Sequence, residues 1–417
     1  MPTVEGLGAR QAALQMLDSV LRRGQTLEAA AGSERKLSPA DHGLALAIAG
    51  ETLRRIPDLD GLIDSATRNR LADDSKARTV LRLALAQKIG LGTPDHAVVS
   101  TALPLVDGGP RRLVHGVLGT LLRRGLPAID APRLPADVER RLGSAWGEDV
   151  VAAARRQMAA RPALDLTFAD DAEAQAYASA NNGSSLAPNN VRLPSSSVSD
   201  LPGFGEGRWW VQDLAASLPA RLIGKAGDVL DLCAAPGGKT MQLAAAGHRV
   251  TSVDASGSRL ERLRENLERT HLEARLVEAD ALTWEPKQQF DAILLDAPCS
   301  ATGTFRRHPE VFYRARPRII AENAELQARL LAKAAGFLKP GGTLVYAVCS
   351  LEPEEGEQVI VNFPHNHPDF IAAAPQPGEL PDFVTPTAEG HVRVLPGLLE
   401  AEGGLDGFFI ARLVRRG

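Results

Sequence analysis

Five short apolar segments between residues 228 and 350 place the strongest constraint on how this chain can fold. Each ends in, or is directly followed by, an acidic or a small residue, and helical patterns separate them; the segments are DVLDL, HRVTSVD, ARLVEAD, FDAILLD and TLVYAVCS. Buried apolar strands that alternate with helices are typical of a doubly wound α/β sheet with mainly parallel strands. We therefore expect residues 208–417 to form one α/β domain.

Residues 1–130 follow a different pattern, in which apolar side chains recur at helical spacing. The amphipathic segments are 9–23, 75–91 and 110–125. Ser38 followed by Pro39 is a helix-start signal, and Gly125 is a helix-stop signal. The pattern predicts an all-helical domain of five to seven helices.

A connecting region is expected between these two domains, at residues 131–207. Its first part, residues 137–161, shows a helical pattern. Its last part, residues 189–207, is polar and rich in turn-forming residues, so it is predicted to be a loop or linker.

Charge is unevenly distributed along the chain. The whole chain carries 47 Lys and Arg against 51 Asp and Glu, but residues 1–125 carry 17 basic against 13 acidic residues. Four arginine pairs occur in this first part: Arg22/Arg23, Arg54/Arg55, Arg111/Arg112 and Arg123/Arg124. Such pairs could bind the phosphates of a nucleic acid, or they could simply be solvated helix surface.

Cysteine content and hydropathy exclude several classes of protein. The only cysteines are Cys233, Cys299 and Cys349, too few and too far apart for a disulfide framework or a zinc cluster, so no metal site is expected. The first residues lack a signal-peptide pattern, and no apolar run approaches the ~20 residues of a membrane helix. A soluble, cytoplasmic protein is expected.

A glycine loop, DLCAAPGGKT, follows the first apolar strand at residues 231–240. Gly237 and Gly238 let the backbone approach a ligand at the start of a helix. An ATP-binding P-loop needs glycine where this chain has Cys233, and the dinucleotide pattern G-x-G-x-x-G is absent. The loop is therefore assigned to another nucleoside-containing ligand.

Three acidic residues end the next strands: Asp254, Asp280 and Asp296. An acid at the end of the second strand can accept hydrogen bonds from ribose hydroxyls, although aspartate also caps turns and helices. Together with the glycine loop the set suits S-adenosylmethionine, with Asp254 at the ribose, Asp280 at the adenine edge and the loop at the methionyl part.

Cys299 and Cys349 each lie just past a buried strand, and each precedes a serine, in DAPCSATG and AVCSLEPEE. A lone cysteine in such a place is usually a small core residue, and Cys233 is interpreted in that way. Two thiols at two strand ends indicate covalent catalysis. A thiolate that adds to carbon 6 of a pyrimidine makes carbon 5 nucleophilic enough to accept a methyl group.

At these motifs the chain resembles the RsmB/Sun/Fmu-type RNA (cytosine-5) methyltransferases, in DLCAAPGGKT, VDAS, EADALTW, DAPCSATGTFRRHPE and YAVCSLEPEE. Residues 81–102 and LVHGVLGTLLRRG resemble a NusB-like RNA-binding domain, which points to small-subunit (16S) ribosomal RNA as the substrate. The resemblance implies a Rossmann-like, S-adenosylmethionine-dependent methyltransferase domain behind an all-α NusB-like domain.

The resemblance also implies roles for individual residues. Cys349 is the expected nucleophile and Cys299 the helper in product release, while Lys239 and Asp296 contact the target cytosine. The expected cofactor-binding residues are Cys233, Ala234, Ala235, Pro236, Gly237, Gly238, Lys239, Asp254, Asp280 and Asp296. The chain departs from the family pattern at Val348, where threonine is usual, and at Ala255, where a second acid is common.

Alternative functions remain open at this point. The chain could be a NusB-like RNA-binding or antitermination factor with a vestigial methyltransferase domain, a tRNA cytosine-5 methyltransferase, or a methyltransferase of proteins or small molecules. The intact Lys239, Asp296, Cys299 and Cys349 argue against a vestigial domain. Arginines after the Cys299 loop are expected to grip RNA phosphates; the basic residues are Arg306, Arg307, His308, Arg314, Arg316 and Arg318.

Overall fold

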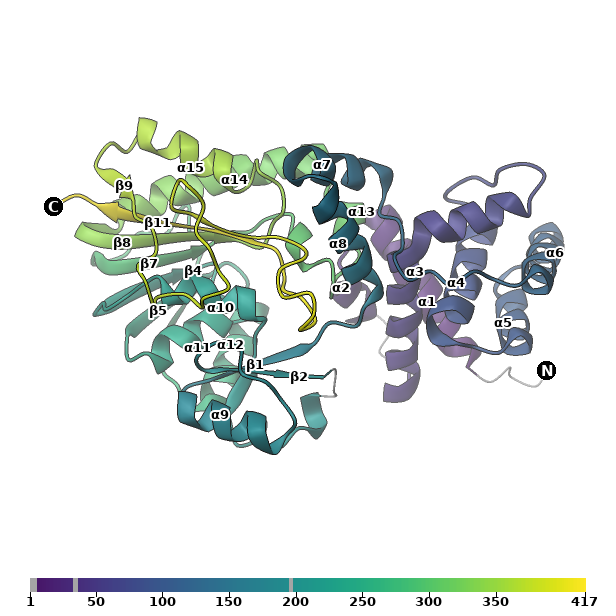
Figure 1. Ribbon diagram of the computed structural model, residues 1–417, viewed down its shortest axis with the longest axis horizontal. Coiled ribbons are helices and arrows are strands. Elements are labelled where there is room, and N and C mark those ends of the chain that lie inside the picture. Colours follow the sequence, from purple (N-terminus) through teal and green to yellow (C-terminus); the bar gives the residue numbers. More distant parts are fainter. Residues whose placement is uncertain (1–5, 33–36, 195–197) are drawn as a thin grey trace. The chain divides into compact units, whose positions relative to one another are not determined.

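A computed structural model describes residues 6–32, 37–194 and 198–417 (Figure 1). The chain divides into two compact units. The helical unit contains Met1–Ala160 and Phe305–Ala315, and the catalytic unit contains Arg161–Thr304 and Arg316–Gly417. The boundaries expected at residues 130 and 207 therefore differ from the boundary between the compact units, which lies near residue 160. In addition, residues 305–315 belong to the helical unit.

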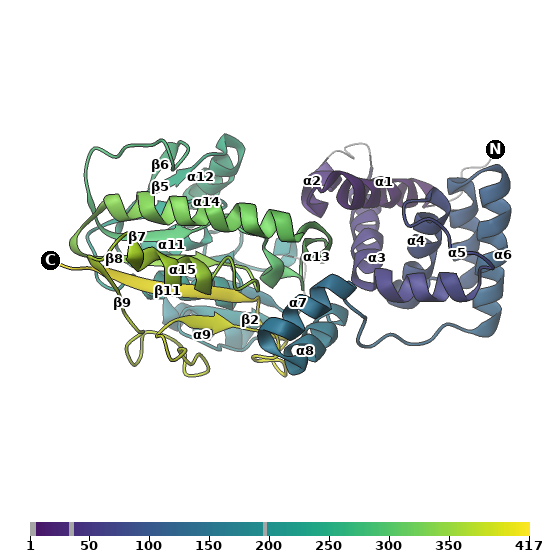
Figure 2. The ribbon, with the colours of Figure 1, turned by 90° about the horizontal axis from the view of Figure 1, so that it is seen from above.

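Six α-helices occupy the described part of residues 1–130, as the apolar pattern predicts (Figure 2). They are α1 (Leu7–Arg23), α2 (Leu27–Gly32), α3 (Pro39–Ser65), α4 (Lys76–Leu91), α5 (Asp95–Ala102) and α6 (Gly108–Arg124). The Ser38 side chain accepts a hydrogen bond from the Asp41 N–H with Pro39 in the first turn, and Gly125 ends α6, so these start and stop signals are confirmed. Two further helices of this unit, α7 (Ala136–Trp146) and α8 (Glu148–Ala159), divide the predicted helical segment at Gly147.

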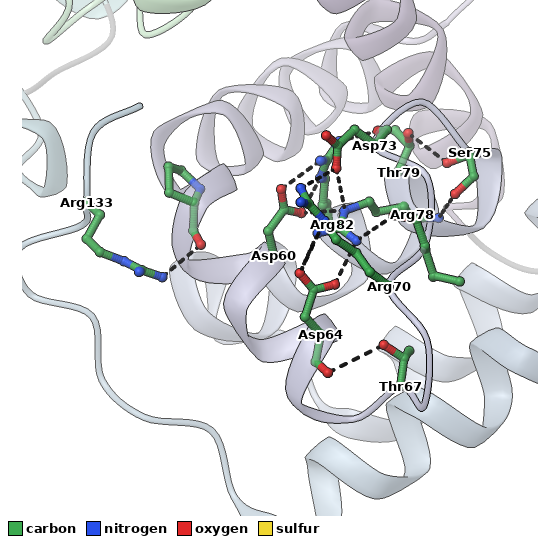
Figure 3. A network of polar contacts seen from close by, with 12 residues as sticks. Asp60, Asp64, Thr67, Arg70, Asp73, Ser75, Arg78, Thr79, Arg82 and Arg133 are labelled. Atoms are coloured by element: carbon green, nitrogen blue, oxygen red, sulfur yellow. Dashed lines mark hydrogen bonds and ion pairs between the residues drawn. The ribbon is translucent and has the colours of Figure 1, made fainter. Parts of the chain in front are cut away.

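Buried arginines link α3 to α4 in the helical unit (Figure 3). The Arg78 side chain is fully buried and donates to Asp64 Oδ1 at 2.8 Å and to Asp60 Oδ1 at 3.0 Å. Arg82 binds both carboxylate oxygens of Asp60, at 2.7 and 2.8 Å. Hydrogen bonds from Arg78 lower the pKa of Asp64. The guanidinium groups of Arg78 and Arg82 thus each have a carboxylate partner, which offsets the cost of removing the guanidinium from water.

The Arg54/Arg55 pair is part of the interior of the helical unit, so its interpretation as phosphate-binding surface is wrong. Their side chains are 12% and 8% exposed, and both lie against Glu51. Arg54 also donates to the backbone oxygen of Met158 at 3.0 Å.

Residues 305–315 belong to the helical unit although they directly follow the Cys299 loop in sequence. This segment contains helix α13 (Val311–Arg314). Phe305 stacks on Phe312 with ring centroids 5.0 Å apart, and Tyr313 Oη donates to the Leu53 oxygen at 2.8 Å. Glu310 Oε1 accepts from the Leu27 N–H at 3.1 Å.

This location corrects the prediction that the arginines after Cys299 bind phosphates as a group. Arg306 is 1% exposed, and its backbone oxygen accepts a hydrogen bond from Arg54. Arg314 donates to the Gly24 oxygen at 2.8 Å, and Arg318 pairs with Glu322.

The catalytic unit is built on a large mixed sheet (Figure 1). The strand order is β10-β11-β8-β7-β4-β5-β6, and β9 pairs with β11. The predicted strands are β4 (Asp228–Leu232), β5 (Arg249–Asp254), β6 (Arg275–Glu278), β7 (Phe290–Asp296) and β8 (Leu338–Val348), and all five are parallel. The antiparallel strands are β9 (Phe370–Ala372), β10 (Val392–Val394) and β11 (Phe408–Arg415).

Helices cover both faces of this sheet, as a doubly wound fold requires (Figures 1 and 2). One face packs against α14 (Pro317–Gly336) and α15 (Glu357–Asn362). The other packs against α10 (Leu214–Arg221) and α11 (Gly238–Ala245). Helix α12 (Gly257–Thr270) connects β5 to β6.

A second, three-stranded sheet takes two of its strands from residues 131–207, where only helix and loop were expected. It has the order β2-β1-β3, with β1 (Leu164–Phe168), β2 (Asn190–Leu193) and β3 (Trp209–Val211), and α9 (Asp171–Ala180) follows β1. The linker prediction for residues 189–207 is therefore wrong at β2, whose residues are all buried; residues 195–197 lie outside the described residues. Tertiary packing overrides the polar composition here, because buried Arg192 pairs with buried Asp165 at 2.6 Å.

Neither a membrane span nor a metal cluster appears in the described ranges. No helix among them is long and apolar enough to cross a bilayer. No group of three or more His, Cys, Asp or Glu side chains in the same ranges is arranged to hold a metal ion.

Candidate active site

The glycine loop connects β4 to α11 at the carboxyl end of the sheet. Gly237 has φ +106°, and a Cβ atom there would lie 2.0 Å from Leu263 Cδ1, so only glycine fits. The predicted loop residues Cys233, Ala234, Ala235 and Pro236 precede it, and Cys233 also has a positive φ of 61°. The sharp turn therefore presents loop backbone at the strand end, where ligands bind in such sheets.

Asp254 is the acid that the fold brings to this loop. It ends β5, is 4% exposed, and accepts hydrogen bonds from the Ala235 N–H at 3.1 Å and the Ser256 N–H at 3.0 Å. Arg259 Nη2 lies 3.7 Å from its Oδ2. A carboxylate has about four acceptor positions, so these two bonds leave capacity for ribose hydroxyls.

Asp280 lies two residues beyond β6 and is exposed, and its Oδ1 accepts from the Leu282 N–H at 2.9 Å. The preceding Ala279 N–H donates to the backbone carbonyl oxygen of Asp254 at 3.1 Å. This bond joins the Asp280 turn to the end of β5, while the side chain itself caps its own turn.

Asp231 is a buried acid under the glycine loop that sequence reasoning missed, although it opens the loop motif. It is 0% exposed, and the Thr240 hydroxyl donates to its Oδ2 at 2.6 Å. Burial raises the pKa of Asp231 to about 7. Its Oδ1 atom has no hydrogen-bond partner among the described residues.

The structure agrees with the interpretation of Cys233 as a packing residue. Burial, together with the nearby acids Asp254 and Asp296, raises the pKa of Cys233 to about 12. The side chain packs against the apolar core of the sheet. A thiol that keeps its proton in this way is not a nucleophile near neutral pH.

Lys239 and Asp296 form a buried ion pair between the first turn of α11 and the end of β7. Lys239 Nζ lies 2.6 Å from Asp296 Oδ2, and the two side chains are 10% and 29% exposed. Burial by itself would lower the pKa of Lys239, but Asp296, together with Cys349 and Asp231, outweighs it and the pKa is raised. Lys239 is thus a fixed ammonium, and Nζ also lies 5.2 Å from the centre of the Phe408 ring.

The two cysteines expected to act in catalysis meet at neighbouring strand ends. Strands β7 and β8 pair in parallel, with Asp296 opposite Ala347, and the Sγ atoms of Cys299 and Cys349 are 3.5 Å apart. The hydrogen bond with Cys349 and burial both raise the pKa of Cys299 well above its ordinary value. The charge of Cys349 also favours the ammonium form of Lys239, which places the ion pair within electrostatic reach of this thiol.

These donors and acceptors fit a bound S-adenosylmethionine. The loop backbone, the partly satisfied carboxylate of Asp254 and the unpartnered Oδ1 of buried Asp231 lie at the ends of the adjacent strands β4 and β5. Loop backbone and strand-end acids are what a nucleoside carrying an amino-acid group requires.

Comparisons with known proteins agree over the whole chain. Residues 224–414 match the family described as 16S rRNA methyltransferase RsmB/F, and residues 7–123 match the NusB family. The ribosomal RNA small subunit methyltransferase B of Erwinia tasmaniensis is 34% identical over 97% of this chain and 98% of its own length. The protein of the same description from Klebsiella pneumoniae subsp. pneumoniae is 35% identical over 99% of each chain.

Solved structures share the fold. The crystal structure of PH0851 superposes with a TM-score of 0.74 over 99% of both chains at 22% identity, which concerns the fold alone. A methyltransferase homolog protein from Pyrococcus horikoshii has a TM-score of 0.55 at 27% identity, over 71% of this chain and 98% of its own. Because about a third of all positions are identical in full-length relatives, across both units, the chain belongs to the RsmB/F family of S-adenosylmethionine-dependent methyltransferases.

Proposed function

We propose that this protein methylates carbon 5 of a cytosine in small-subunit (16S) ribosomal RNA, through a covalent adduct with Cys349. The observation that carries the proposal is the pair of thiols, whose sulfur atoms lie 3.5 Å apart beside the Lys239–Asp296 ion pair. Methyl transfer to an amino group requires no thiol, whereas carbon 5 of cytosine must first be activated by a nucleophile. The names of the full-length relatives favour small-subunit ribosomal RNA as the substrate, and the cytoplasm is the proposed place of action.

The proposed reaction begins at Cys349. Its thiol loses a proton to solvent, the thiolate sulfur bonds to carbon 6 of the base, and the electrons of the double bond between carbons 5 and 6 become available at carbon 5. S-adenosylmethionine held at the glycine loop would supply an electrophilic methyl group for this carbon, and the bond from the methyl group to its sulfonium would break to leave a neutral thioether. The carbon-5 proton then leaves, the double bond forms again, and the bond between carbon 6 and sulfur breaks, which returns the thiolate to Cys349.

Cys299 is the proposed acceptor of the carbon-5 proton. While Cys349 is free, its hydrogen bond and its charge keep Cys299 protonated, so that Cys299 donates to the Cys349 thiolate. Once the Cys349 sulfur is bonded to carbon, both of these effects on the Cys299 pKa are removed. Cys299 can then lose its proton to solvent and take the proton from carbon 5, which leaves it as the original thiol.

Lys239 and Asp296 are proposed to orient the cytosine. The ammonium of Lys239 donates and the carboxylate of Asp296 accepts, so the pair complements the carbonyl oxygen and the amino group of the base. Lys239 is held by Asp296 at 2.6 Å before any substrate binds, which fixes the position of both groups. The cofactor is assigned to loop residues 233–239 with Asp254 and Asp280, and Asp296 borders it.

RNA binding is assigned in part to helix α6 of the helical unit. This helix contains no acidic residue, and Arg111, Arg112, Arg123 and Arg124 are all exposed. Guanidinium groups without neighbouring carboxylates on their own helix are suited to phosphate contact. Arg22 of the exposed Arg22/Arg23 pair contacts Asp18 on its own helix, so the two pairs of α6 are the ones assigned to the phosphate-binding surface.

The thiol roles are tested by trapping the adduct on denaturing gels. Cys349→Ala should neither methylate RNA nor form an adduct, because no nucleophile remains. Cys299→Ala should accumulate a protein–RNA species in the presence of cofactor, because the loss of a proton-transfer partner slows release by about 10²–10⁴. The double variant, which keeps Cys233, is the control and should trap nothing. An adduct with Cys349→Ala and none with Cys299→Ala would reverse the two roles.

The substrate is tested by bisulfite sequencing of small-subunit ribosomal RNA and tRNA after incubation with the protein and cofactor. A protected cytosine in the ribosomal RNA, absent with Cys349→Ala, supports the proposal. Protection confined to tRNA would assign the enzyme to tRNA instead. Protection of neither RNA, by a protein that binds ribosomal RNA tightly, would favour the alternative of an RNA-binding factor.

A further inference from the structure

A single buried carboxylate, Glu355, holds the loops that follow both thiols. Ser300 comes directly after Cys299, and Ser350 comes directly after Cys349. Glu355 Oε1 accepts from the Ser300 N–H at 2.8 Å, and Oε2 accepts from the Ser300 hydroxyl at 2.5 Å and from the Ser350 hydroxyl. Glu355 is 0% exposed, so these bonds do not compete with water.

Further hydrogen bonds tie the same two loops together. The Gly303 N–H donates to the Cys349 oxygen at 3.0 Å, and the Leu351 N–H donates to Thr302 Oγ1 at 2.9 Å. The Tyr346 hydroxyl donates to the backbone oxygen of Glu355 at 2.6 Å, which fixes the glutamate to β8. The Cys299 loop and the Cys349 loop are therefore one cross-linked layer with Glu355 at its centre.

Burial of the Glu355 carboxylate costs free energy, which favours a role for its charge beyond structural support. Removing it from water costs several kcal/mol, which hydrogen bonds from neutral donors offset only in part. The neighbouring cation Arg393 is engaged by Glu357, to which it donates at 2.9 and 2.5 Å, and by the Ser350 oxygen at 2.6 Å. The hydrogen bonds of Glu355 to Ser300 and Ser350 place its carboxylate beside the residues that follow both thiols.

We propose that Glu355 is a positioning residue that sets the distance between the two thiols through its bonds to Ser300 and Ser350, and that its buried charge disfavours a second thiolate beside a Cys349 thiolate. The inference rests on the thiol roles in the proposed function. A thiol at position 299 can donate a hydrogen bond to a thiolate at position 349, whereas two thiolates 3.5 Å apart would repel each other. The carboxylate thus favours the thiol form at Cys299 over the thiol form at Cys349.

The groups around Cys299 act in the same direction. Its pKa is raised by the hydrogen bond with Cys349, by burial, by the charge of Cys349 and by the charge of Glu355. Tyr346 also faces this layer, and burial keeps its hydroxyl protonated by raising its pKa well above the ordinary value. The ammonium of Lys239 is paired with the carboxylate of Asp296. The charge of Glu355 is thus one of the effects that oppose ionisation of Cys299.

The test uses Glu355→Gln, with Glu354→Gln as a matched control at the exposed neighbouring glutamate. Glutamine keeps an oxygen for the Ser300 N–H but removes the charge. Alkylation of Cys299 by iodoacetamide is followed against pH, with mass spectrometry to resolve the site. Removal of the Glu355 charge should shift the midpoint to lower pH, so that Cys299 is alkylated faster at a fixed pH below it. The control should leave the profile unchanged.

A second variant, Glu355→Asp, separates charge from spacing, because it keeps the carboxylate but is too short to bind both serines in the same way. It should retain the alkylation profile and yet lose methylation, with kcat reduced at least about tenfold and the KM for RNA unchanged. If Glu355→Gln fails to fold, as judged by lost cofactor binding, Ser350→Ala removes one of the three bonds and should reduce kcat in the same way.

An unchanged Cys299 profile in folded Glu355→Gln, or equal shifts in both glutamine variants, would overturn the inference. The alkylation readout does not depend on turnover. It therefore distinguishes failure of this inference from failure of the proposed function, which would appear as methylation by Cys349→Ala.

Discussion

Replacing Asp231 by asparagine should change how the stability of the catalytic unit depends on pH. The buried side chain has its pKa raised from 3.8 to about 7, chiefly by burial and against the hydrogen bond from Thr240. Between about pH 4 and pH 7 the folded protein holds a proton that the unfolded chain has lost. The free energy of unfolding that Asp231 contributes is therefore fully present below pH 4 and is lost as the pH rises to about 7.

The magnitude follows from the two pKa values. One pKa unit corresponds to about 1.4 kcal/mol, so the complete loss is at most about 4 kcal/mol, of which about 3 kcal/mol falls between pH 5 and pH 8. Asparagine cannot ionise, and its Oδ1 can still accept from Thr240. Relative to Asp231→Asn, the unmodified protein should therefore lose about 3 kcal/mol of stability across this interval.

The measurement is equilibrium urea unfolding at pH 5 and at pH 8, followed by tryptophan fluorescence. Trp209, Trp210 and Trp284 lie in the catalytic unit and report its unfolding. Asp382→Asn, at an exposed aspartate, is the control and should not alter the pH dependence. If Asp231→Asn and the unmodified protein show the same difference between the two pH values, Asp231 is ionised in the folded state and the argument fails.

Three further predictions concern the cofactor, the RNA and the division into units. Asp254→Ala should weaken S-adenosylmethionine binding at least about tenfold, because each lost hydrogen bond to a carboxylate is worth about 1.5–3 kcal/mol; unchanged affinity by calorimetry would remove Asp254 from the site. Arg111→Glu with Arg112→Glu should reduce the slope of RNA affinity against salt by about 1–2 without changing cofactor affinity; an equal slope would exclude this face of α6 as a phosphate contact. Phe305→Ala removes a fully buried ring that stacks on Phe312, so it should lower the free energy of unfolding by about 3–5 kcal/mol. It should also lower hydrogen-exchange protection in α1 and α3 more than in β4. A loss of protection confined to β4 would contradict the assignment of residues 305–315 to the helical unit.

The location of Phe305 also changes how the helical unit should be tested. Residues 305–315 take their hydrogen-bond partners from α2 and α3, at Leu27 and Leu53. Deletion of residues 1–125 would therefore expose a buried segment adjacent to the Cys299 loop, so that loss of RNA binding could not be separated from loss of structure. Point substitutions on α6 avoid this difficulty.

Local patterns in the sequence were sufficient to predict the parts of the fold that depend on residues close together along the chain. The five parallel strands, the helices of residues 1–130 and the caps at Ser38 and Gly125 follow from periodicity and from residue types that satisfy helix ends. The glycine loop and the strand-end residues Asp254, Cys299 and Cys349 were predictable for the same reason, since parallel strands bring their carboxyl ends to one edge.

Only the tertiary structure decided which side chains are buried and what they face. Arg54 and Arg306 are of a residue type that is common on RNA-binding surfaces, but both are buried in the helical unit by residues that are distant in sequence. The same holds for Glu355, whose role depends on Ser300, 55 positions away, and for β2, a polar strand that packing covers. Sequence periodicity reports the local conformation of the backbone, whereas the partners that compensate a buried charge are brought together only when the chain folds.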